Sequence, residues 1–417
     1  MRTLRVSLGL VLTGVLPSFG AVSSPGPDSL APAPGSYRGV FASQGKEIPF
    51  QFELAKSGDL YTAALVNGRE RTVVDKVSVE AGVLLMVWSG YGNSLRATIA
   101  DGTLSGTLKI SRRGGVVDEL PVTARHGEGY RFFPAPDASP ANFAGRFEVA
   151  FARRDGSTSP AVAELEQEGA AVTGTFLTET GDQRFLAGEA KGNNLYLSTF
   201  FGSSPSLHVA TLNADGTLSG EQWSGKAGYS TWKAKPNPKA ALRDPLGITQ
   251  LKPGYDGLAF TFPNIDGQKV SLSDPRYRGK VVLVTISGSW CPNCHDETAF
   301  MAPFYKENRE RGLESIELMY EYSGDFQEAA AAVRRFKEKF GVEYELLIAG
   351  VSDKDKASET LPMLSEVYAY PTTIVIDRRG KVRRIHTGFT GPGTGEHYRE
   401  FVSEFTEFID GLLAEGT

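Results

Sequence analysis

The sequence predicts a multidomain protein in which an all-β N-terminal region, built from two related β-sandwich or barrel-like blocks, precedes an α/β domain. At 417 residues the chain is too long for a single hydrophobic core. Up to about residue 232 its short segments alternate apolar and polar residues and are separated by Gly, Asn and Asp, which is typical of β structure. Beyond residue 250, strand-like runs alternate with longer helical patterns, which is typical of an α/β fold.

The first 21 residues are predicted to be a secretory signal peptide. Arg2 and Arg5 precede a short apolar stretch, residues 6–15, and small residues before Ala21 offer a cleavage point. This stretch is about half as long as the ~20 residues of a membrane-spanning helix, and an uncleaved anchor is the alternative. Residues 22–35 are rich in Pro, Ser, Ala and Gly and predict an extended tether. We therefore expect a location in the periplasm or elsewhere in the cell envelope, where disulfides persist.

An internal repeat divides the β region into two blocks, residues 36–131 and residues 142–234. The string Asp-Gly-Thr-Leu-Ser-Gly occurs at residues 101–106 and again at residues 215–220. Each copy lies near the end of a block that opens with an aromatic residue close to a Gly, Tyr37 in the first and Phe143 in the second. This equivalent placement favours duplication over chance identity. Each block has room for roughly eight short strands.

Residues 252–417 are predicted to form the α/β domain, after a Pro-rich linker at residues 235–245. The expected elements are a strand at 281–286, a helix at 291–311, a strand at 316–321, a helix at 326–340, an extended segment at 344–348, a helix at 360–367, strands at 372–377 and 381–386, and a last helix after Gly395. This order describes a βαβ unit that is followed by a β-hairpin and a closing helix.

The only two cysteines of the chain, Cys291 and Cys294, lie where the expected strand 281–286 gives way to a helix. On a first helical turn their Cα atoms would lie near disulfide distance. The free N–H groups of that turn would stabilise a thiolate, and Pro292 is compatible with an early helical position. We therefore expect a redox-active disulfide in which an exposed Cys291 is the nucleophile and a deeper Cys294 resolves the mixed disulfide.

A structural disulfide and a zinc site are the alternatives for this pair. A disulfide that closes so short a loop removes little entropy from the unfolded chain. A zinc site needs four ligands, and the five scattered histidines supply no second pair at metal spacing. Redox chemistry is therefore favoured, and neither a metal nor a cofactor is expected.

Two motifs of the α/β domain resemble those of the thioredoxin fold. They are Trp290-Cys291-Pro292-Asn293-Cys294 after a buried strand, and Tyr370-Pro371-Thr372 about 80 residues later. The flanking strings at residues 266–273, 278–284 and 377–382 resemble the TlpA/ResA type of exported thiol–disulfide oxidoreductase, and the resemblance covers about residues 252–415. The β region resembles additional N-terminal segments of some bacterial members of this family.

The resemblance implies that an extended substrate segment binds beside Trp290, Tyr370 and Pro371. Pro371 matches the family's cis-proline, which packs against the dithiol, and a cis Tyr–Pro bond is chemically accessible. An ordinary trans turn proline is the alternative.

The resemblance also implies a catalytic role for Glu297 beside the two cysteines. Glu297 faces the same side of the helix as Cys294 and matches a family glutamate. Burial would raise its pKa and let it accept the Cys294 proton. Many thioredoxins carry a buried Asp six residues before the first cysteine, but Thr285 occupies that position here. An acid that only favours the helix dipole is the alternative for Glu297, and His295 is expected at the surface.

These features predict an exported enzyme that reduces protein disulfides through a mixed disulfide. We expect disulfide-containing protein substrates and a membrane-bound electron donor. The net charge of −5 argues against a nucleic-acid partner. A thiol peroxidase is a second candidate, although Gly288 stands where such a site carries Thr. In a third, the β repeats bind a ligand or partner, or act as spacers. The direction of electron flow depends on the reduction potential and not on residue types.

Overall fold

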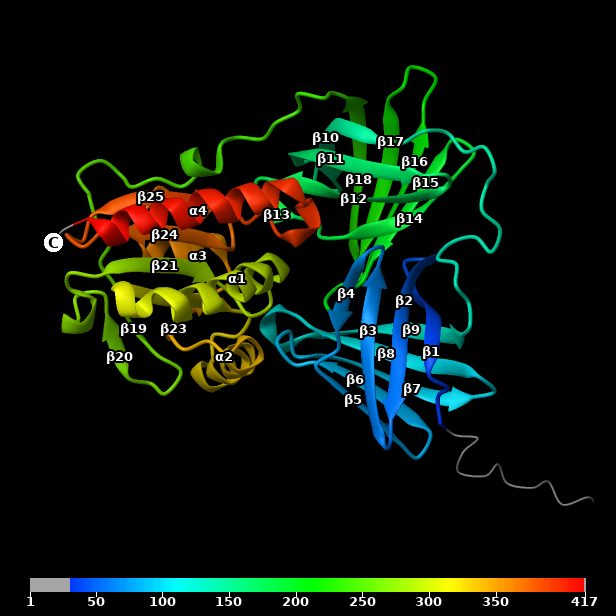
Figure 1. Cartoon of the computed structure of the whole chain (residues 1–417), viewed down its shortest axis with the longest axis horizontal. Coiled ribbons are helices and arrows are strands. Elements are labelled where there is room, and N and C mark those ends of the chain that lie inside the picture. Colours follow the sequence, from blue (N-terminus) through cyan, green and yellow to red (C-terminus); the bar gives the residue numbers. More distant parts are fainter. Residues whose placement is uncertain (1–30, 416–417) are drawn as a thin grey trace, which may run out of the picture.

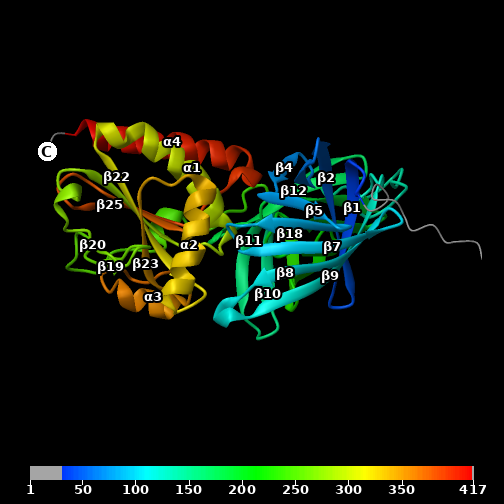
Figure 2. The ribbon, with the colours of Figure 1, turned by 90° about the horizontal axis from the view of Figure 1, so that it is seen from below.

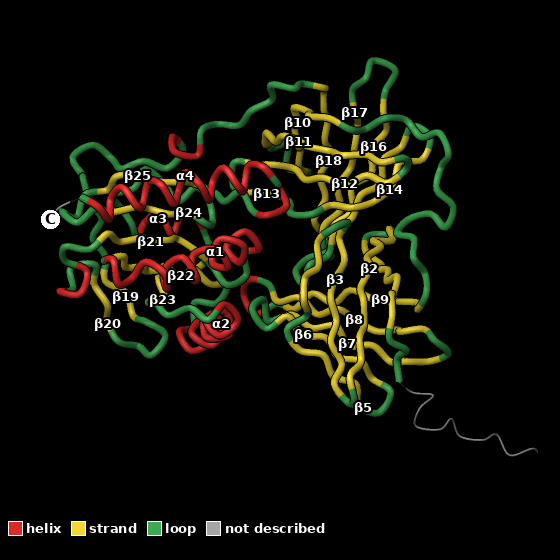
Figure 3. Tube along the Cα trace, in the orientation of Figure 1, coloured by secondary structure: helices red, strands yellow, loops and turns green. Residues whose placement is uncertain are grey.

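The strands of residues 35–236 form two separate nine-stranded sheets, and every α-helix of the described residues lies in the C-terminal part (Figure 3). The structure is a computed structural model that describes residues 31–415. The predicted fold class, an all-β region followed by an α/β domain, is confirmed. The predicted signal peptide and most of the predicted tether lie outside the described residues. Within residues 31–415, no helix is long and apolar enough to span a membrane.

The first β block is an open, curved meander, a half-barrel with β4 and β5 at its edges. The strand order is β4-β3-β2-β1-β9-β8-β7-β6-β5, one strand more than the roughly eight expected. The strands are β1 Gly35–Ser43, β2 Lys46–Ser57, β3 Leu60–Asn67, β4 Glu70–Val73, β5 Lys76–Glu80, β6 Val83–Trp88, β7 Asn93–Ala100, β8 Thr103–Ser111 and β9 Val117–His126.

The second β block is also nine-stranded, and the pairing of β11 with β12 closes it into a barrel. The strands are β10 Gly145–Arg153, β11 Thr158–Glu168, β12 Ala171–Thr178, β13 Gly181–Asp182, β14 Leu186–Lys191, β15 Asn194–Thr199, β16 Ser206–Leu212, β17 Leu218–Ser224 and β18 Gly228–Pro236. The repeated string begins at the β7–β8 turn in the first block and at the β16–β17 turn in the second. The last strand of each block pairs with the first strand of the same block, β9 with β1 and β18 with β10.

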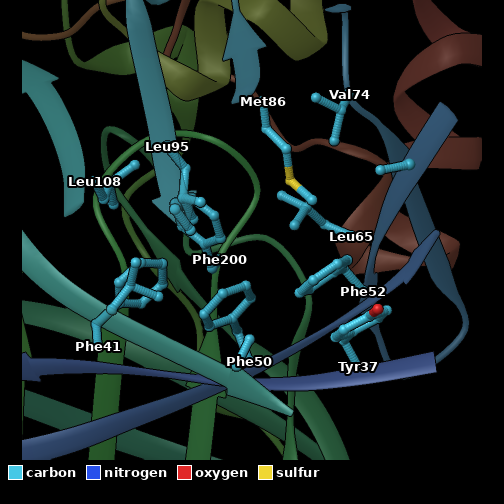
Figure 4. Close-up of a cluster of buried hydrophobic side chains, with 14 of the residues drawn as sticks. Tyr37, Phe41, Phe50, Phe52, Leu65, Val74, Met86, Leu95, Leu108 and Phe200 are labelled. Atoms are coloured by element: carbon cyan, nitrogen blue, oxygen red, sulfur yellow. The ribbon is translucent and has the colours of Figure 1, made fainter. Parts of the chain in front are cut away.

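Phe200 of the second block fills the open side of the first. Figure 4 shows the Phe200 ring beside Phe41 and Phe50. The centroid of this ring lies 4.8 Å from that of Phe41, 5.3 Å from that of Phe50 and 5.2 Å from that of Trp88. The Asn67 side chain donates a hydrogen bond to the Phe200 carbonyl at 3.0 Å. The core of the first block is therefore completed by residues of the second block, which cover apolar surface that the half-barrel alone would expose to solvent. The second block also has a separate hydrophobic core of its own.

The C-terminal domain has a five-stranded sheet in the order β23-β22-β21-β24-β25. Strands β21, β22 and β23 run parallel to one another, and β24 pairs antiparallel with both of its neighbours, β21 and β25. Buried side chains of α1, α2 and α4 pack on one face of this sheet, and those of α3 pack on the other. The elements are β19 Thr261–Pro263, β20 Lys269–Ser271, β21 Val281–Ser287, α1 Pro292–Asn308, β22 Leu313–Glu321, α2 Phe326–Phe340, β23 Glu345–Val351, α3 Lys354–Thr360, β24 Thr372–Ile376, β25 Val382–Thr387 and α4 Glu396–Ala414.

The helix expected at residues 360–367 is wrong. Helix α3 covers Lys354–Thr360 instead, where the Asp353 side chain accepts the Lys356 N–H and caps the first turn. Pro362 follows its end, and a helix rarely continues through the residue before a proline.

The three parts of the chain meet around the N-terminal end of α1. Figures 1 and 2 both show the C-terminal domain beside the two β blocks. Asp75 of the first block forms an ion pair with Lys339 of the C-terminal domain at 3.1 Å. Arg184 of the second block forms an ion pair with Asp296 of the same domain at 2.9 Å. Because Asp296 follows Cys294 by two residues, the β blocks lie directly beside the dithiol.

Candidate active site

The dithiol forms the N-terminal end of α1. Cys291 is the N-cap residue, and its sulfur accepts the backbone N–H of Cys294 at 3.3 Å. The Cys291 thiol lies 3.3 Å from the Tyr370 carbonyl oxygen, to which it donates. Both cysteines are free thiols. The expected exposure of Cys291 is wrong, because only 5% of the residue is accessible. The second β block covers this end of the helix. This contact was not predictable because the β block and the dithiol are far apart in the sequence.

Cys294 lies behind Cys291 and has no accessible surface. Burial raises the pKa of the Cys294 thiol well above its usual value, and the neighbouring Cys291 raises it further. The Ser287 hydroxyl opposes this rise. A base is therefore needed before Cys294 can attack a mixed disulfide.

The residues expected to bind substrate are brought together beside Cys291. The Tyr370–Pro371 peptide bond is cis. The Trp290 indole N–H donates to the Tyr320 carbonyl at 2.8 Å, and its ring meets the Tyr370 ring edge-on, with centroids 5.5 Å apart. This arrangement leaves Trp290 partly exposed beside the nucleophile.

Glu297 lies on the first turns of α1 and is only 2% exposed. Burial raises its pKa to about 8, and the nearby charge of Glu317 adds to the rise. The Thr373 hydroxyl opposes it by donating to the carboxylate at 2.8 Å. Thr285, where many thioredoxins carry Asp, lies 3.0 Å from the Thr373 hydroxyl. The two threonines thus hold Glu297 from the neighbouring strands.

Glu317 is a second buried acid that sequence reasoning missed. It lies on β22, is 1% exposed, and accepts hydrogen bonds from Thr298 and Tyr344, each at 3.2 Å. Burial raises its pKa to about 7. The Ser287 hydroxyl lowers the pKa of both Glu317 and Cys294, yet forms no close hydrogen bond. A readable signal was present in the sequence, because Glu317 interrupts the apolar residues of the expected strand 316–321.

The expected surface position of His295 is wrong. His295 is 4% exposed and stacks on Tyr91 of the first β block, with ring centroids 3.8 Å apart and planes inclined by 4°. Its Nε2 lies 2.7 Å from the Ser289 carbonyl, so the ring donates there as a neutral imidazole. Burial lowers its pKa well below the usual value.

The second β block contacts the middle of the Cys-x-x-Cys motif through β13. The Asn293 side-chain amide accepts the Asp182 N–H at 2.7 Å and donates to the Asp182 carbonyl at 3.2 Å. A Cβ on the preceding Gly181 would lie 1.5 Å from the Asn293 amide, so only glycine allows this approach. Asn293 therefore binds the backbone of β13 much as a neighbouring strand would.

Three residues from three parts of the chain form an ion cluster under the same helix. The Arg184 guanidinium contacts Glu70 at 3.0 Å and Asp296 at 2.9 Å, and these side chains are between 10% and 12% exposed. Burial raises the pKa of Asp296 to about 7, and Arg184 opposes that rise. The dithiol helix is thus fixed to both β blocks at once.

Fold and site together define a thiol–disulfide oxidoreductase with a thioredoxin-like domain. Residues 253–385 match the AhpC/TSA family. The thiol-disulfide oxidoreductase ResA of Geobacillus thermodenitrificans is 30% identical over 140 residues, which are 34% of this chain and 72% of the relative. ResA of Halalkalibacterium halodurans is 28% identical over 156 residues, 37% of this chain and 76% of the relative. The chain belongs to the ResA family of thiol–disulfide oxidoreductases.

Two solved structures are also similar to part of the chain. One is a putative protein disulfide isomerase from Bacteroides thetaiotaomicron, with 24% identity, a TM-score of 0.30, and coverage of 40% of this chain and 94% of that chain. The other is a putative thiol:disulfide interchange protein DsbE from Chlorobium tepidum, with 20% identity, a TM-score of 0.28, and coverage of 37% of this chain and 98% of that chain.

Proposed function

We propose that this protein is an exported reductase of protein disulfides that works in the cell envelope and receives electrons from a membrane-bound donor. The observation that carries the proposal is the pair of free thiols at the N-terminal end of α1, beside the Tyr370 carbonyl and cis-Pro371. A helix N-terminus stabilises the thiolate that thiol–disulfide exchange requires.

The reaction transfers two electrons from the dithiol to the substrate. The Cys291 thiolate attacks one sulfur of a substrate disulfide, so that a Cys291–substrate bond forms and the second substrate sulfur leaves as a thiolate. The Cys294 thiolate then attacks the Cys291 sulfur and releases the first substrate sulfur. The protein ends with a Cys291–Cys294 disulfide, which the donor must reduce before the next turnover.

Glu297 is the proposed acceptor of the Cys294 proton. Its pKa of about 8 is close to neutral pH, where a general base is most effective. The donor that holds its carboxylate is the neutral hydroxyl of Thr373 and not a cationic side chain. Proton transfer to Glu297 would supply the thiolate that the raised pKa of Cys294 otherwise withholds.

A trapping experiment tests the proposed function. Full-length Cys294→Ser protein, mixed with insulin, is expected to accumulate a mixed disulfide that dithiothreitol releases, whereas Cys291→Ser protein forms none. Wild-type protein should reduce the insulin disulfides and leave no adduct. Insulin reduction by the Cys291→Ser variant at the wild-type rate would show that another group is the nucleophile. A wild-type protein that only oxidises reduced substrates would reverse the proposed direction.

A further inference from the structure

The nucleophile opens into a groove that the second β block builds together with the C-terminal domain. This groove has a volume of about 560 Å³. The barrel contributes Arg153, Thr158 and Gln183 to its lining, and the C-terminal domain contributes Lys354 and Tyr370. Such a volume lies within the range of sites that bind small ligands or a few residues of a peptide. The barrel therefore forms one wall of the groove that contains Cys291 and is not a remote spacer.

The nucleophile presents little of its surface to the groove. Cys291 is 5% exposed, so a disulfide on the flat surface of a large folded domain has less access to its sulfur than a disulfide in a small, flexible chain such as insulin. A bridge joins the two walls of the groove, where the Glu179 carboxylate accepts a hydrogen bond from Tyr368 at 2.5 Å and pairs with Arg243 at 2.6 Å. A single extended segment, with side chains that alternate in direction, fits such a groove better than a folded surface does.

The charges available to a ligand in the groove are positive. Glu179 is paired with Arg243, and the Asp182 carboxylate accepts the backbone N–H groups of Gly391 at 2.7 Å and Arg184 at 2.6 Å. The basic lining residues, by contrast, are exposed and make only weak contacts. They are Arg153, with one hydrogen bond of 3.5 Å to Ser157, and Lys354, 5.3 Å from the Tyr368 ring centroid.

We propose that this groove selects extended, disulfide-bearing segments with acidic residues beside the cysteine, and that Arg153 and Lys354 provide the selectivity. Arg153 comes from the barrel, so the second β block determines which substrates react. The proposal rests on the proposed function, because it names the substrate class of the same dithiol. Complementary charges at an entrance mainly raise the association rate, by tenfold or more at low salt.

Matched substrates test the selectivity in single-turnover reactions of the reduced full-length protein. Two nine-residue peptides carry one cysteine as a mixed disulfide with 2-mercaptoethanol, and it is flanked by four Glu residues in one peptide and four Lys residues in the other. Hydroxyethyl disulfide is the small neutral reference. We expect the Glu peptide to react about tenfold faster than the Lys peptide at 20 mM salt, with the difference shrinking at 500 mM as charges are screened.

Charge reversal assigns the effect to the groove. The double variant Arg153→Glu/Lys354→Glu should abolish or invert the preference for the Glu peptide, while its rate with hydroxyethyl disulfide reports any change in Cys291 reactivity. The double variant Lys76→Glu/Lys269→Glu changes net charge equally at exposed positions outside the groove lining and should keep the preference.

Three results would overturn the selectivity. The first is equal wild-type rates for the Glu and Lys peptides. The second is an equal loss of rate with the Glu peptide and with hydroxyethyl disulfide in Arg153→Glu/Lys354→Glu. The third is the same loss of preference for the Glu peptide in both double variants. Failure of wild-type protein to reduce any of the three disulfides would instead refute the proposed function, and the selectivity with it.

Discussion

Replacing Glu297 by Gln is expected to slow the release of substrate from the mixed disulfide by about 100-fold, the usual range for loss of a positioned general base. Formation of the mixed disulfide should stay unchanged, because that step uses Cys291. In the wild type, release should accelerate as pH rises through about 8, where the Glu297 carboxyl loses its proton. The variant should lack this rise. Stopped-flow measurement of both steps between pH 6 and pH 9.5 separates the two effects.

Glu317→Gln is the matched control, because Glu317 is an equally buried acid that contacts the dithiol helix through Thr298. We expect its release rate to stay within about threefold of the wild type. If release were slowed more by Glu317→Gln than by Glu297→Gln, Glu317 would be the proton acceptor, with Ser287 between its carboxyl and Cys294. Equal rates for both variants and the wild type would show that neither acid takes the proton.

Stability supplies an independent readout for Glu297. Its folded pKa of about 8 lies above the usual value of 4.5, so the folded state binds the extra proton between these values. The stabilising contribution of this proton to the free energy of unfolding is therefore fully present below pH 4.5 and is lost as pH rises through 8. Glu297 alone adds a slope of up to about 1.4 kcal/mol per pH unit. Glu297→Gln should remove that part of the slope and be more stable than the wild type at pH 8.5. A purely structural role would change this slope without changing substrate release.

The sequence predicted those features whose signal is local. Alternation of period two in the β region and the Cys291–Cys294 spacing report on neighbouring residues, so fold class and dithiol followed directly. Whether a sheet closes depends instead on twist and stagger accumulated over all its strands. For that reason the sequence did not distinguish the open first block from the closed second one. Asp353 and Pro362 are the local start and stop signals of α3, and they place this helix before residue 361 and not at residues 360–367.

The surroundings of the dithiol were not predictable from one sequence. Tyr91 and His295 are separated by about 200 residues, and nothing local marks one as the partner of the other. The same holds for Asn293 and the backbone of Asp182. The sequence left open whether the β region binds a ligand or partner or acts as a spacer, because its contacts with the active site are all long-range. The structure shows instead that both β blocks touch the Cys-x-x-Cys helix within five residues of Cys291.

Replacing Arg184 by Met is expected to destabilise the junction of the three parts by about 3 kcal/mol at pH 8, because it leaves two buried carboxylates without a counter-charge. Arg184 now contacts both Glu70 and Asp296. The loss should be smaller at pH 5. Asp296 already has a pKa of about 7 despite the opposing effect of Arg184, so without Arg184 it would be neutral at pH 5. Urea titrations at both pH values, followed by alkylation of Cys291, measure the opening of this junction.

Two further variants separate the ion cluster from ordinary surface pairing. Lys109→Met removes an ion pair whose two side chains are each 56% exposed, and it should cost less than about 1 kcal/mol. The triple variant Arg184→Met/Glu70→Gln/Asp296→Asn removes every charge of the cluster and should regain most of the lost stability, since its buried groups are then neutral. If Arg184→Met costs no more than Lys109→Met, the cluster does not hold the dithiol helix against the β blocks. The packing of Tyr91 on His295 and of β13 on Asn293 would then carry that contact alone.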